Sequence, residues 1–314
     1  MTTTKPKAAA AARIGAALAA RKRGELLGLL RPCFVRCGPW LQAGKYLGAL
    51  ASDLPKRNGW TIAQQVGDQA PLRTQRLLNR AVWDTVAAMG VVRRFAVAGL
   101  DEAARTAGRR RGLAVGAIDE TGQVKAGIRT AGVKRQYLGC AGKVANGINT
   151  VHLAYVREGT GHALIGAREW IPAAQVGDPA RSAAMGLPED LVFRTKGQLA
   201  IDILAEAFAD GVLLDFVCGD EVYGWCTELR EYLEDHDQAY VLRIPSSFRL
   251  TLASGITLTC KQAAARLGRR GWEIRSAGTG SKGERWYAWA WIGTASAGHH
   301  LLICLLYTSD AADE

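Results

Sequence analysis

Two aspartates stand where carboxylates could hold a metal ion. Asp119 directly follows the apolar segment 113–118, and Asp220 follows Gly219 after the apolar segment 212–218. Both segments have the length and composition of buried strands, and polar residues at strand ends of an α/β sheet are open to ligands. If the strands are adjacent, the carboxylates could share Mg²⁺ or Mn²⁺, which accept oxygen ligands. Such a site can activate water or a hydroxyl for phosphodiester cleavage, although either residue alone is typical of a turn.

The residues from 112 to 245 predict the sheet that would position these aspartates. A Thr-x-x-Gln capping box at 195–198 opens a helix that Gly211 closes, and a second amphipathic helix is expected over 225–235. Strands followed by helix, strand, helix and strand predict a mixed α/β layer. The expected strands cover 113–118, 133–138, 150–156, 212–218 and 239–244.

The last part of the chain differs in composition. Residues 246–303 are Gly-rich and strand-like, which predicts a β-rich insertion. Residues 300–303 are typical of a strand in progress, but residues 304–314 resemble the translation of a sequencing-library adapter. We therefore expect 304–314 to be a non-native tail and the native reading frame to be cut near Ile303.

The N-terminal residues 1–111 predict a helical, basic region. Thr61 could cap a short helix over 62–66, and after a turn Pro71 suits the start of a second helix. That pattern is typical of a helix-turn-helix DNA reader, but an ordinary surface helix would look similar. One face of this second helix, which starts at Pro71, would carry Arg73, Arg76 and Arg80. A broad apolar face would carry Leu77, Leu78, Ala81 and Val82.

Residues 101–112 are expected to form a linker or a surface hairpin.

The positive charge of the chain is concentrated at its front. The net charge is +11, and residues 1–111 hold 20 Lys/Arg against 6 Asp/Glu, whereas residues 112–314 hold 20 against 23. Such a basic region favours a polyanionic partner, leaving DNA, RNA and an anionic membrane surface open, as well as merely solvated arginines. An integral membrane protein is not expected, because no apolar run reaches about 18 residues. The seven scattered cysteines suit reduced thiols in a cytosol.

Several short motifs, taken in order, resemble the DDE-type transposases of prokaryotic insertion sequences. The resemblance runs from about Trp40 to Pro245 and covers most of the chain, and the ordered set is more specific than any single motif. The motifs are YLGAL (46–50), NGWTIA (58–63), QRLLNR (75–80) with Trp83 and Asp84, AIDETG (117–122), GVKRQY (132–137) with Gly139, and GDEVYG (219–224).

The resemblance implies an RNase H-like fold that follows a helical DNA-binding region. Asp119 and Asp220 would be the first two catalytic acids and would carry Mg²⁺ or Mn²⁺. The third acid of such a triad is a Glu on a helix after the insertion, and no such helix is found in this sequence, since Glu284 lies among strand-like residues. A chain that lacks this acid is expected to be inactive. Glu120 and Glu221 are expected to face water, while Lys134 and Arg135 could contact a phosphate.

The resemblance also implies partners and a place of action. The partner would be double-stranded DNA, both the terminal repeats of the element and the target, with no membrane involved. A homodimer is expected by analogy with enzymes that pair two ends, and the localisation would be cytoplasmic and nucleoid-associated. Two other interpretations stay open at this point, a non-enzymatic DNA-binding fragment and an RNase H-like nuclease that does not transpose.

Overall fold

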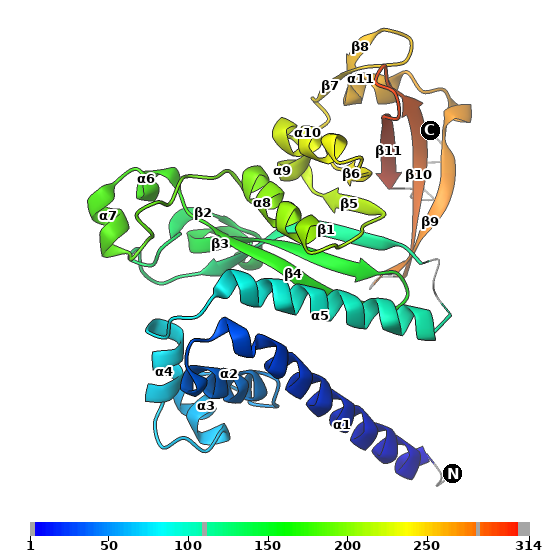
Figure 1. Ribbon diagram of the computed structural model, residues 1–314. Helices are drawn as coiled ribbons and strands as arrows, with labels where there is room; N and C mark the ends of the chain where they lie inside the picture. Colours follow the sequence, from blue (N-terminus) through cyan, green and yellow to red (C-terminus); the bar gives the residue numbers. More distant parts are fainter. Residues whose placement is uncertain (1–3, 109–111, 281–282, 307–314) are drawn as a thin grey trace. The chain divides into compact units, whose positions relative to one another are not determined.

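The computed structural model describes residues 4–108, 112–280 and 283–306 (Figure 1). The chain forms two compact units. The first contains the residues up to Gly219 together with Cys226–Val241, and the second contains Asp220–Trp225 and the residues from Leu242 onward. Helices pack on a sheet that has both parallel and antiparallel strands, so the predicted mixed α/β class is confirmed.

The main sheet has six strands. They are β1 (Ala114–Val124), β2 (Lys134–Leu138), β3 (Lys143–Arg157), β4 (Gly161–Trp170), β5 (Phe216–Gly219) and β6 (Tyr240–Leu242). The order is β2–β3–β1–β5–β6, and β4 also pairs with β3. β3 pairs antiparallel with β1, β2 and β4, whereas β5 runs parallel to β1. The long β3 therefore joins the antiparallel part of the sheet into one layer.

Alternate residues of β3 point to opposite sides of the sheet. Val151, Leu153 and Tyr155 are almost completely buried, whereas the residues between them are only partly buried. We call the side that carries these three residues the core face. The opposite side carries His152 and, because direct cross-strand partners share a face, its partner Asp119. We call this side the Asp119 face.

Three helices of the first unit complete its core. They are α5 (Thr85–Thr106), α8 (Lys196–Ala209) and α10 (Thr227–Asp235). α8 packs on β3, β4 and α10, and α5 packs on β4. Thr195 and Gln198 form the predicted capping box at the start of α8. The α8 side chain of Ile203 lies where a Cβ at Gly166 of β4 would sit, so this glycine lets the helix approach the sheet closely.

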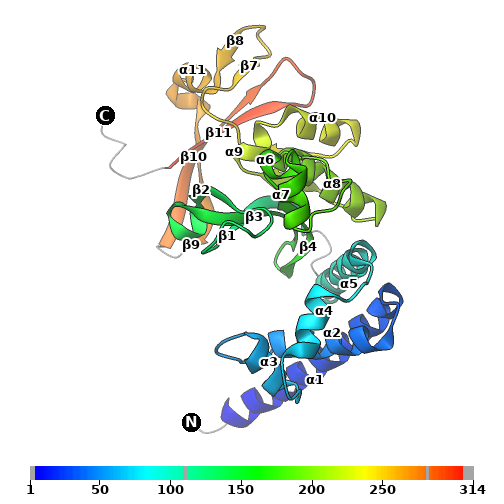
Figure 2. The same ribbon diagram turned by 90° about the vertical axis from the view of Figure 1, so that its left-hand side faces the viewer.

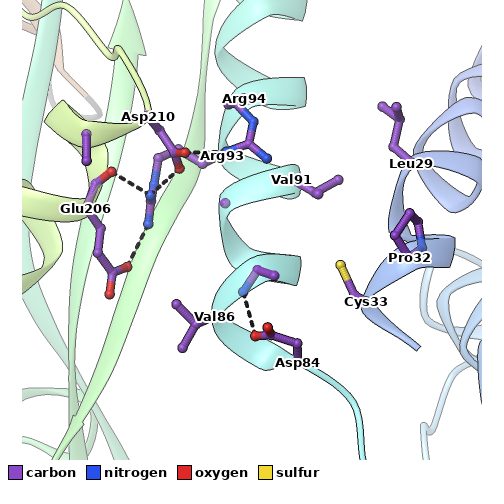
Figure 3. Close-up of a pocket in the computed structure, with 13 residues that line it drawn as sticks. Leu29, Pro32, Cys33, Asp84, Val86, Val91, Arg93, Arg94, Glu206 and Asp210 are labelled. Atoms are coloured by element: carbon purple, nitrogen blue, oxygen red, sulfur yellow. Dashed lines mark hydrogen bonds and ion pairs between the residues drawn. The ribbon is translucent and has the colours of Figure 1, made fainter. Parts of the chain in front are cut away.

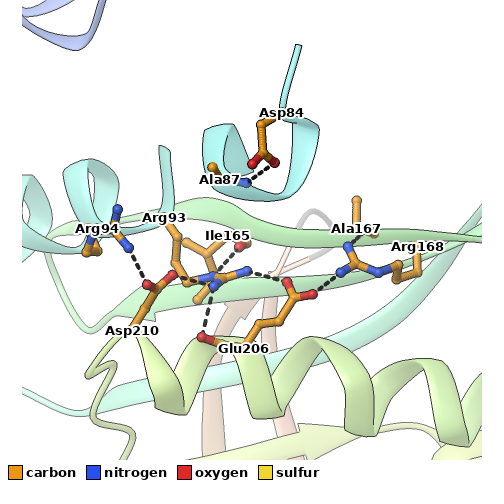
Figure 4. Close-up of polar contacts among 9 residues, drawn as sticks. All are labelled: Asp84, Ala87, Arg93, Arg94, Ile165, Ala167, Arg168, Glu206 and Asp210. Atoms are coloured by element: carbon orange, nitrogen blue, oxygen red, sulfur yellow. Dashed lines mark hydrogen bonds and ion pairs between the residues drawn. The ribbon is translucent and has the colours of Figure 1, made fainter. Parts of the chain in front are cut away.

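A buried arginine connects α5 to the sheet and to α8 (Figure 4). The Arg93 guanidinium donates from Nε to the Ile165 carbonyl at 2.9 Å. It also forms ion pairs with Glu206 (3.0 Å) and Asp210 (2.5 Å). Arg168 of β4 pairs with the other oxygen of Glu206. Because buried charges are tolerated when they are paired and hydrogen-bonded, this network fixes how α5 lies on the sheet.

The N-terminal helices form a group beside α5, on the side away from the sheet (Figure 2). They are α1 (Thr4–Leu30), η1 (Arg31–Cys33), α2 (Cys37–Leu50), α3 (Gly59–Gln65) and α4 (Leu72–Asn79). Leu30, Phe34, Leu77 and Ala88 form a small hydrophobic core there. The prediction of a helical region with a short helix, a turn and a second helix is confirmed for α3 and α4.

Two details of that prediction are wrong. α3 is capped by Asn58, whose side chain accepts from the backbone of Trp60 and Thr61, and Thr61 is the third residue of the helix. α4 ends at Asn79, so Arg80, Ala81 and Val82 lie beyond it, and Leu78 and Val82 are exposed. The helix stops early because Trp83 stacks on Phe34 and Asp84 caps the next helix.

One further prediction differs from the structure, and one strand was missed. Residues 101–106 belong to the helix α5, where Asp101 accepts a hydrogen bond from Tyr155, and are not a linker. Residues 109–111 of the predicted linker or hairpin lie outside the described residues. β4 was not predicted, because its alternation is irregular around a β-bulge in its pairing with β3. Three short helices lie in the connections, namely η2 (Gly139–Ala141), α6 (Ala173–Val176) and α7 (Pro179–Ala184).

The second unit contains mostly strands. Its elements are α9 (Glu221–Gly224), β7 (Arg249–Thr251), β8 (Thr257–Thr259), α11 (Cys260–Ala265), η3 (Arg269–Gly271), β9 (Glu273–Gly280), β10 (Gly283–Gly293) and β11 (His300–Leu306). β11, β10 and β9 form one sheet, and β7 and β8 form another. The strand expected at 300–303 continues to Leu306, and residues 307–314 of the predicted tail lie outside the described residues. No helix within the described ranges is long and apolar enough to cross a membrane.

Candidate active site

The two predicted catalytic aspartates follow paired positions in the main sheet. Ile118 of β1 and Gly219 of β5 are direct partners in the parallel register. Asp119 is the next residue after Ile118, and Asp220 is the next residue after Gly219. The strands that were expected to precede the two acids are therefore neighbours, as the metal-site prediction requires.

The prediction that Asp119 ends its strand is wrong. β1 continues for five residues beyond Asp119, because β3 pairs with it as far as Val124. Asp119 is nevertheless exposed. Its Oδ1 accepts a hydrogen bond from the Glu120 backbone at 2.8 Å. The carboxylate therefore lies on an open part of the sheet surface, where a ligand can approach it.

Glu120 lies on the other side of the sheet. It is opposite the buried Val151, so strand alternation places it on the core face. There it pairs with Lys196 at the start of α8, at 2.5 Å, and both side chains are largely buried. The expectation that Glu120 faces water is wrong, and the residue cannot join Asp119 on one face.

Sequence reasoning missed His152, which is the direct cross-strand partner of Asp119. Its Nδ1 is buried and has no hydrogen-bond partner among the described residues. Burial lowers the pKa of His152, while the Asp119 carboxylate acts in the opposite direction. A buried imidazole nitrogen is thus held at the strand position opposite a carboxylate. Its position in a strand was visible in the sequence, but the register that pairs it with Asp119 was not.

Asp220 begins a short helix that is tightly packed. Its Oδ1 accepts from the Val222 backbone at 2.9 Å, so it caps α9. Tyr223 is completely buried. A Cβ on Gly224 would lie 1.8 Å from the Arg243 carbonyl oxygen, so only glycine fits there. The Asp220 side chain is exposed, and the motif residues that follow it hold the backbone in place. Glu221 is exposed, as expected.

The three arginines predicted to contact DNA are all exposed. Arg73 and Arg76 lie on α4, and Arg80 is the C-cap residue that follows its last residue, Asn79. Arg73 approaches Asp68 at 3.8 Å, which is a long ion pair for a side chain 73% exposed. These guanidinium groups therefore remain available to a polyanion.

Lys134 and Arg135 are separated by the sheet. Lys134 is opposite Gly147 on the core face, and its ammonium lies 5.5 Å from the centre of the Trp170 ring. Arg135 is opposite Asn146, which places it on the Asp119 face, where it is exposed. The sequence suggested the two as a pair, but the structure brings only Arg135 to the side that carries Asp119.

A pocket of about 510 Å³ lies elsewhere in the first unit (Figure 3). Its lining combines apolar residues, such as Leu29 of α1 and Pro32 of η1, with Arg93, Arg94 and Asp210. These charged groups pair with one another, because both arginines contact Asp210. The pocket therefore marks how the N-terminal helices pack on α5, and Asp119 is not among its residues.

A third metal-binding acid is not found in the described residues. They contain no group of three or more His, Cys, Asp or Glu side chains arranged to hold a metal ion. Glu284, which the sequence made a poor candidate, lies on β10 in the second unit. That this chain lacks the third acid stays a prediction.

A parallel strand beside a long antiparallel ribbon, with acids after paired positions, defines a mixed α/β protein. Residues 40–285 match the family model described as DDE superfamily endonuclease, and the chain belongs to that family. The fold is consistent with the RNase H-like architecture of DDE enzymes. Enzymes of this superfamily act on DNA and generally use divalent metal ions. No curated protein matches the chain.

Proposed function

We propose that this protein is the transposase of a prokaryotic insertion sequence, which cuts and joins DNA strands at the terminal repeats of the element. The register that pairs Ile118 with Gly219 is the observation that supports this most, because an acid follows each of these residues. Membership of the DDE endonuclease family supplies the reaction class. The protein would act in the cytoplasm on nucleoid DNA, and a homodimer would pair two ends.

The donor groups present suit a hard divalent cation. Asp119 and Asp220 are exposed, and each uses one carboxylate oxygen in the hydrogen bond to its neighbouring backbone described above. We infer that Asp119 and Asp220 hold Mg²⁺ or Mn²⁺. When bound, the ion would polarise the phosphodiester and lower the pKa of the attacking hydroxyl or water.

Other groups of the chain would bind the DNA and orient the two carboxylates. Arg73, Arg76 and Arg80 would hold phosphates of the duplex, since arginine suits phosphate recognition through charge-assisted hydrogen bonds. The backbone amides of Glu120 and Val222 would orient the two carboxylates. We propose that a third acid is missing from this chain. With two carboxylates, metal affinity and cleavage should both be low.

A nicking assay tests this function. Supercoiled plasmid incubated with the protein and Mn²⁺ should show at most a trace of nicking, as expected of a chain that lacks the third acid. Asp119→Asn should abolish that trace, whereas Glu221→Gln should not. Joining of a precut terminal-repeat end would support a transposase over a nuclease. Nicking that survives Asp119→Asn would contradict the assignment, and DNA binding with no nicking would favour a non-enzymatic DNA-binding fragment.

A further inference from the structure

The end of the main sheet beyond Asp119 forms a three-stranded ribbon. It consists of residues 121–124 of β1, the start of β3 and the whole of β2. Residues 121–157 contain six Lys/Arg and no Asp or Glu. This segment is therefore positively charged in its own sequence, although Arg157 at the far end of β3 pairs with Asp101. A positively charged surface is the complement of a nucleic-acid backbone.

The two faces of the ribbon are not equivalent. On the core face, Leu138 is buried and Lys134 lies over the Trp170 ring. On the Asp119 face, Tyr137 is 65% exposed, and the exposed Arg135 lies two residues before it on the same strand. No ion pair joins Arg135 to a carboxylate among the residues that the structure describes. One face is therefore engaged in packing, while the other presents a free guanidinium and a phenol.

We propose that Arg135 and Tyr137 form a track for the phosphate backbone of double-stranded DNA, on the same face as Asp119. The proposal rests on the proposed function, because it assigns Asp119 to the cleavage site. Both side chains are donors that commonly contact phosphate oxygens. Lys134 takes no part in the track, since its ammonium is held on the opposite face.

The register also sets how far the track lies from the cleavage site. Arg135 is opposite Asn146 and Asp119 is opposite His152, so six residues of β3 separate the two positions. At about 3.3 Å per strand residue this is roughly 20 Å. Phosphates of one strand of B-DNA are about 3.4 Å apart along the axis, so Arg135 would contact the duplex roughly six base pairs from the cut.

DNA-binding measurements on single variants test the track. Anisotropy of a fluorescein-labelled 30-base-pair duplex, titrated with the full chain between 50 and 200 mM NaCl, gives both affinity and salt slope. Arg135→Ala should weaken binding about tenfold and reduce the salt slope by about one ion, as loss of one phosphate contact does. Arg135→Lys should restore most of the slope, and Tyr137→Phe should weaken binding less than Arg135→Ala.

Two matched controls come from the other face of the same ribbon. Lys143 is an exposed cation opposite Leu138, and Lys134 is the cation on Trp170. Lys143→Ala and Lys134→Ala should each leave affinity within about twofold. The track would be overturned if Arg135→Ala and Lys143→Ala weakened DNA binding equally. It would also be overturned if Arg135→Ala did not weaken DNA binding.

Mn²⁺ binding distinguishes a failure of the proposed track from a failure of the proposed function. Mn²⁺ binding measured on the same variants should be unaffected by Arg135→Ala if the variant is folded and the track is distinct from the metal site. Loss of Mn²⁺ binding in Arg135→Ala would overturn the track as an independent surface. Failure of the unchanged protein to bind Mn²⁺ would count against the proposed function and leave the Arg135 comparison valid.

Discussion

Two adjacent arginines, Arg93 and Arg94, differ in the burial of their side chains although they share one carboxylate. Arg93 and Arg94 both pair with Asp210, but the Arg93 side chain is 2% exposed and that of Arg94 is 53% exposed. Arg93 also bonds to the Ile165 carbonyl and to Glu206. Removing one partner of a buried ion pair leaves the other charge uncompensated, whereas exposed pairs contribute little.

Arg93→Ala should therefore lower the free energy of unfolding by about 3 kcal/mol or more, and Arg94→Ala by less than about 1 kcal/mol. Urea denaturation followed by far-UV circular dichroism measures both variants under the same conditions. Similar losses for the two variants would show that burial of Arg93 does not determine its contribution.

At the scale of single elements, Asp68 ties the turn between α3 and α4 to α2. Its carboxylate accepts from Lys45 at 2.7 Å and from Gln42 at 2.9 Å, and its side chain is 4% exposed. The hydrogen bond from Lys45, followed by that from Gln42, lowers the pKa of Asp68 below its ordinary value. The ionised carboxylate therefore stabilises the position of this turn on α2.

Asp68→Asn should cost about 2 kcal/mol at neutral pH, where the carboxylate is charged. A pKa that is lower in the folded state means that this stabilisation is present above the unfolded pKa and is lost as pH falls through the folded value. The difference between the two proteins should thus disappear at the acidic end of a pH series. Thermal melts from pH 7 to pH 2 measure it, and a difference that grows on acidification would contradict the sign.

The close approach of Gly224 to Arg243 predicts that the short helix α9 tolerates no side chain at this position. A Cβ at Gly224 would lie 1.8 Å from a backbone oxygen, so Gly224→Ala must displace α9, which Asp220 caps. We expect a loss of stability of about 3 kcal/mol. Gly268→Ala is the matched control, because nothing lies within 4 Å of a Cβ there. Thermal unfolding compares the two, and equal stabilities would contradict the tight packing of α9.

The local signals in the sequence predicted the elements better than their ends or registers. The capping box at Thr195 and Gln198 specified α8, because a cap depends on residues three apart. The length of β1 and the pairing of Asp119 with His152 depend on β3, about thirty residues away, and no local pattern reports them. The site prediction accordingly named Asp119 but missed His152, and it grouped Lys134 with Arg135 although strand alternation separates them.

At the scale of the whole molecule, charge is distributed unevenly along the chain. Residues 1–111 carry 20 Lys/Arg against 6 Asp/Glu, and the ribbon that follows Asp119 is also basic. The arginines that we assign to DNA lie on α4, at its end and on β2. A binding surface built from such contacts depends on the release of counterions.

DNA binding by the full chain should therefore be steeply salt-dependent. Four phosphate contacts, from Arg73, Arg76, Arg80 and Arg135, predict a slope near −3.6 in a plot of log K against log salt. Affinity for a duplex should fall about 150-fold between 50 and 200 mM NaCl. Anisotropy titrations measure the slope, and binding that is the same at both salt concentrations would exclude this mode of recognition.

The central claim is that Asp119 and Asp220 hold one divalent metal site, and Mn²⁺ binding tests it most directly. Electron paramagnetic resonance of free Mn²⁺ during titration with the full chain gives the affinity. We predict that Asp119→Asn and Asp220→Asn each weaken Mn²⁺ binding by about tenfold or more, and that Glu221→Gln, next to Asp220 and exposed, does not. Unchanged binding in either aspartate variant would contradict a shared site.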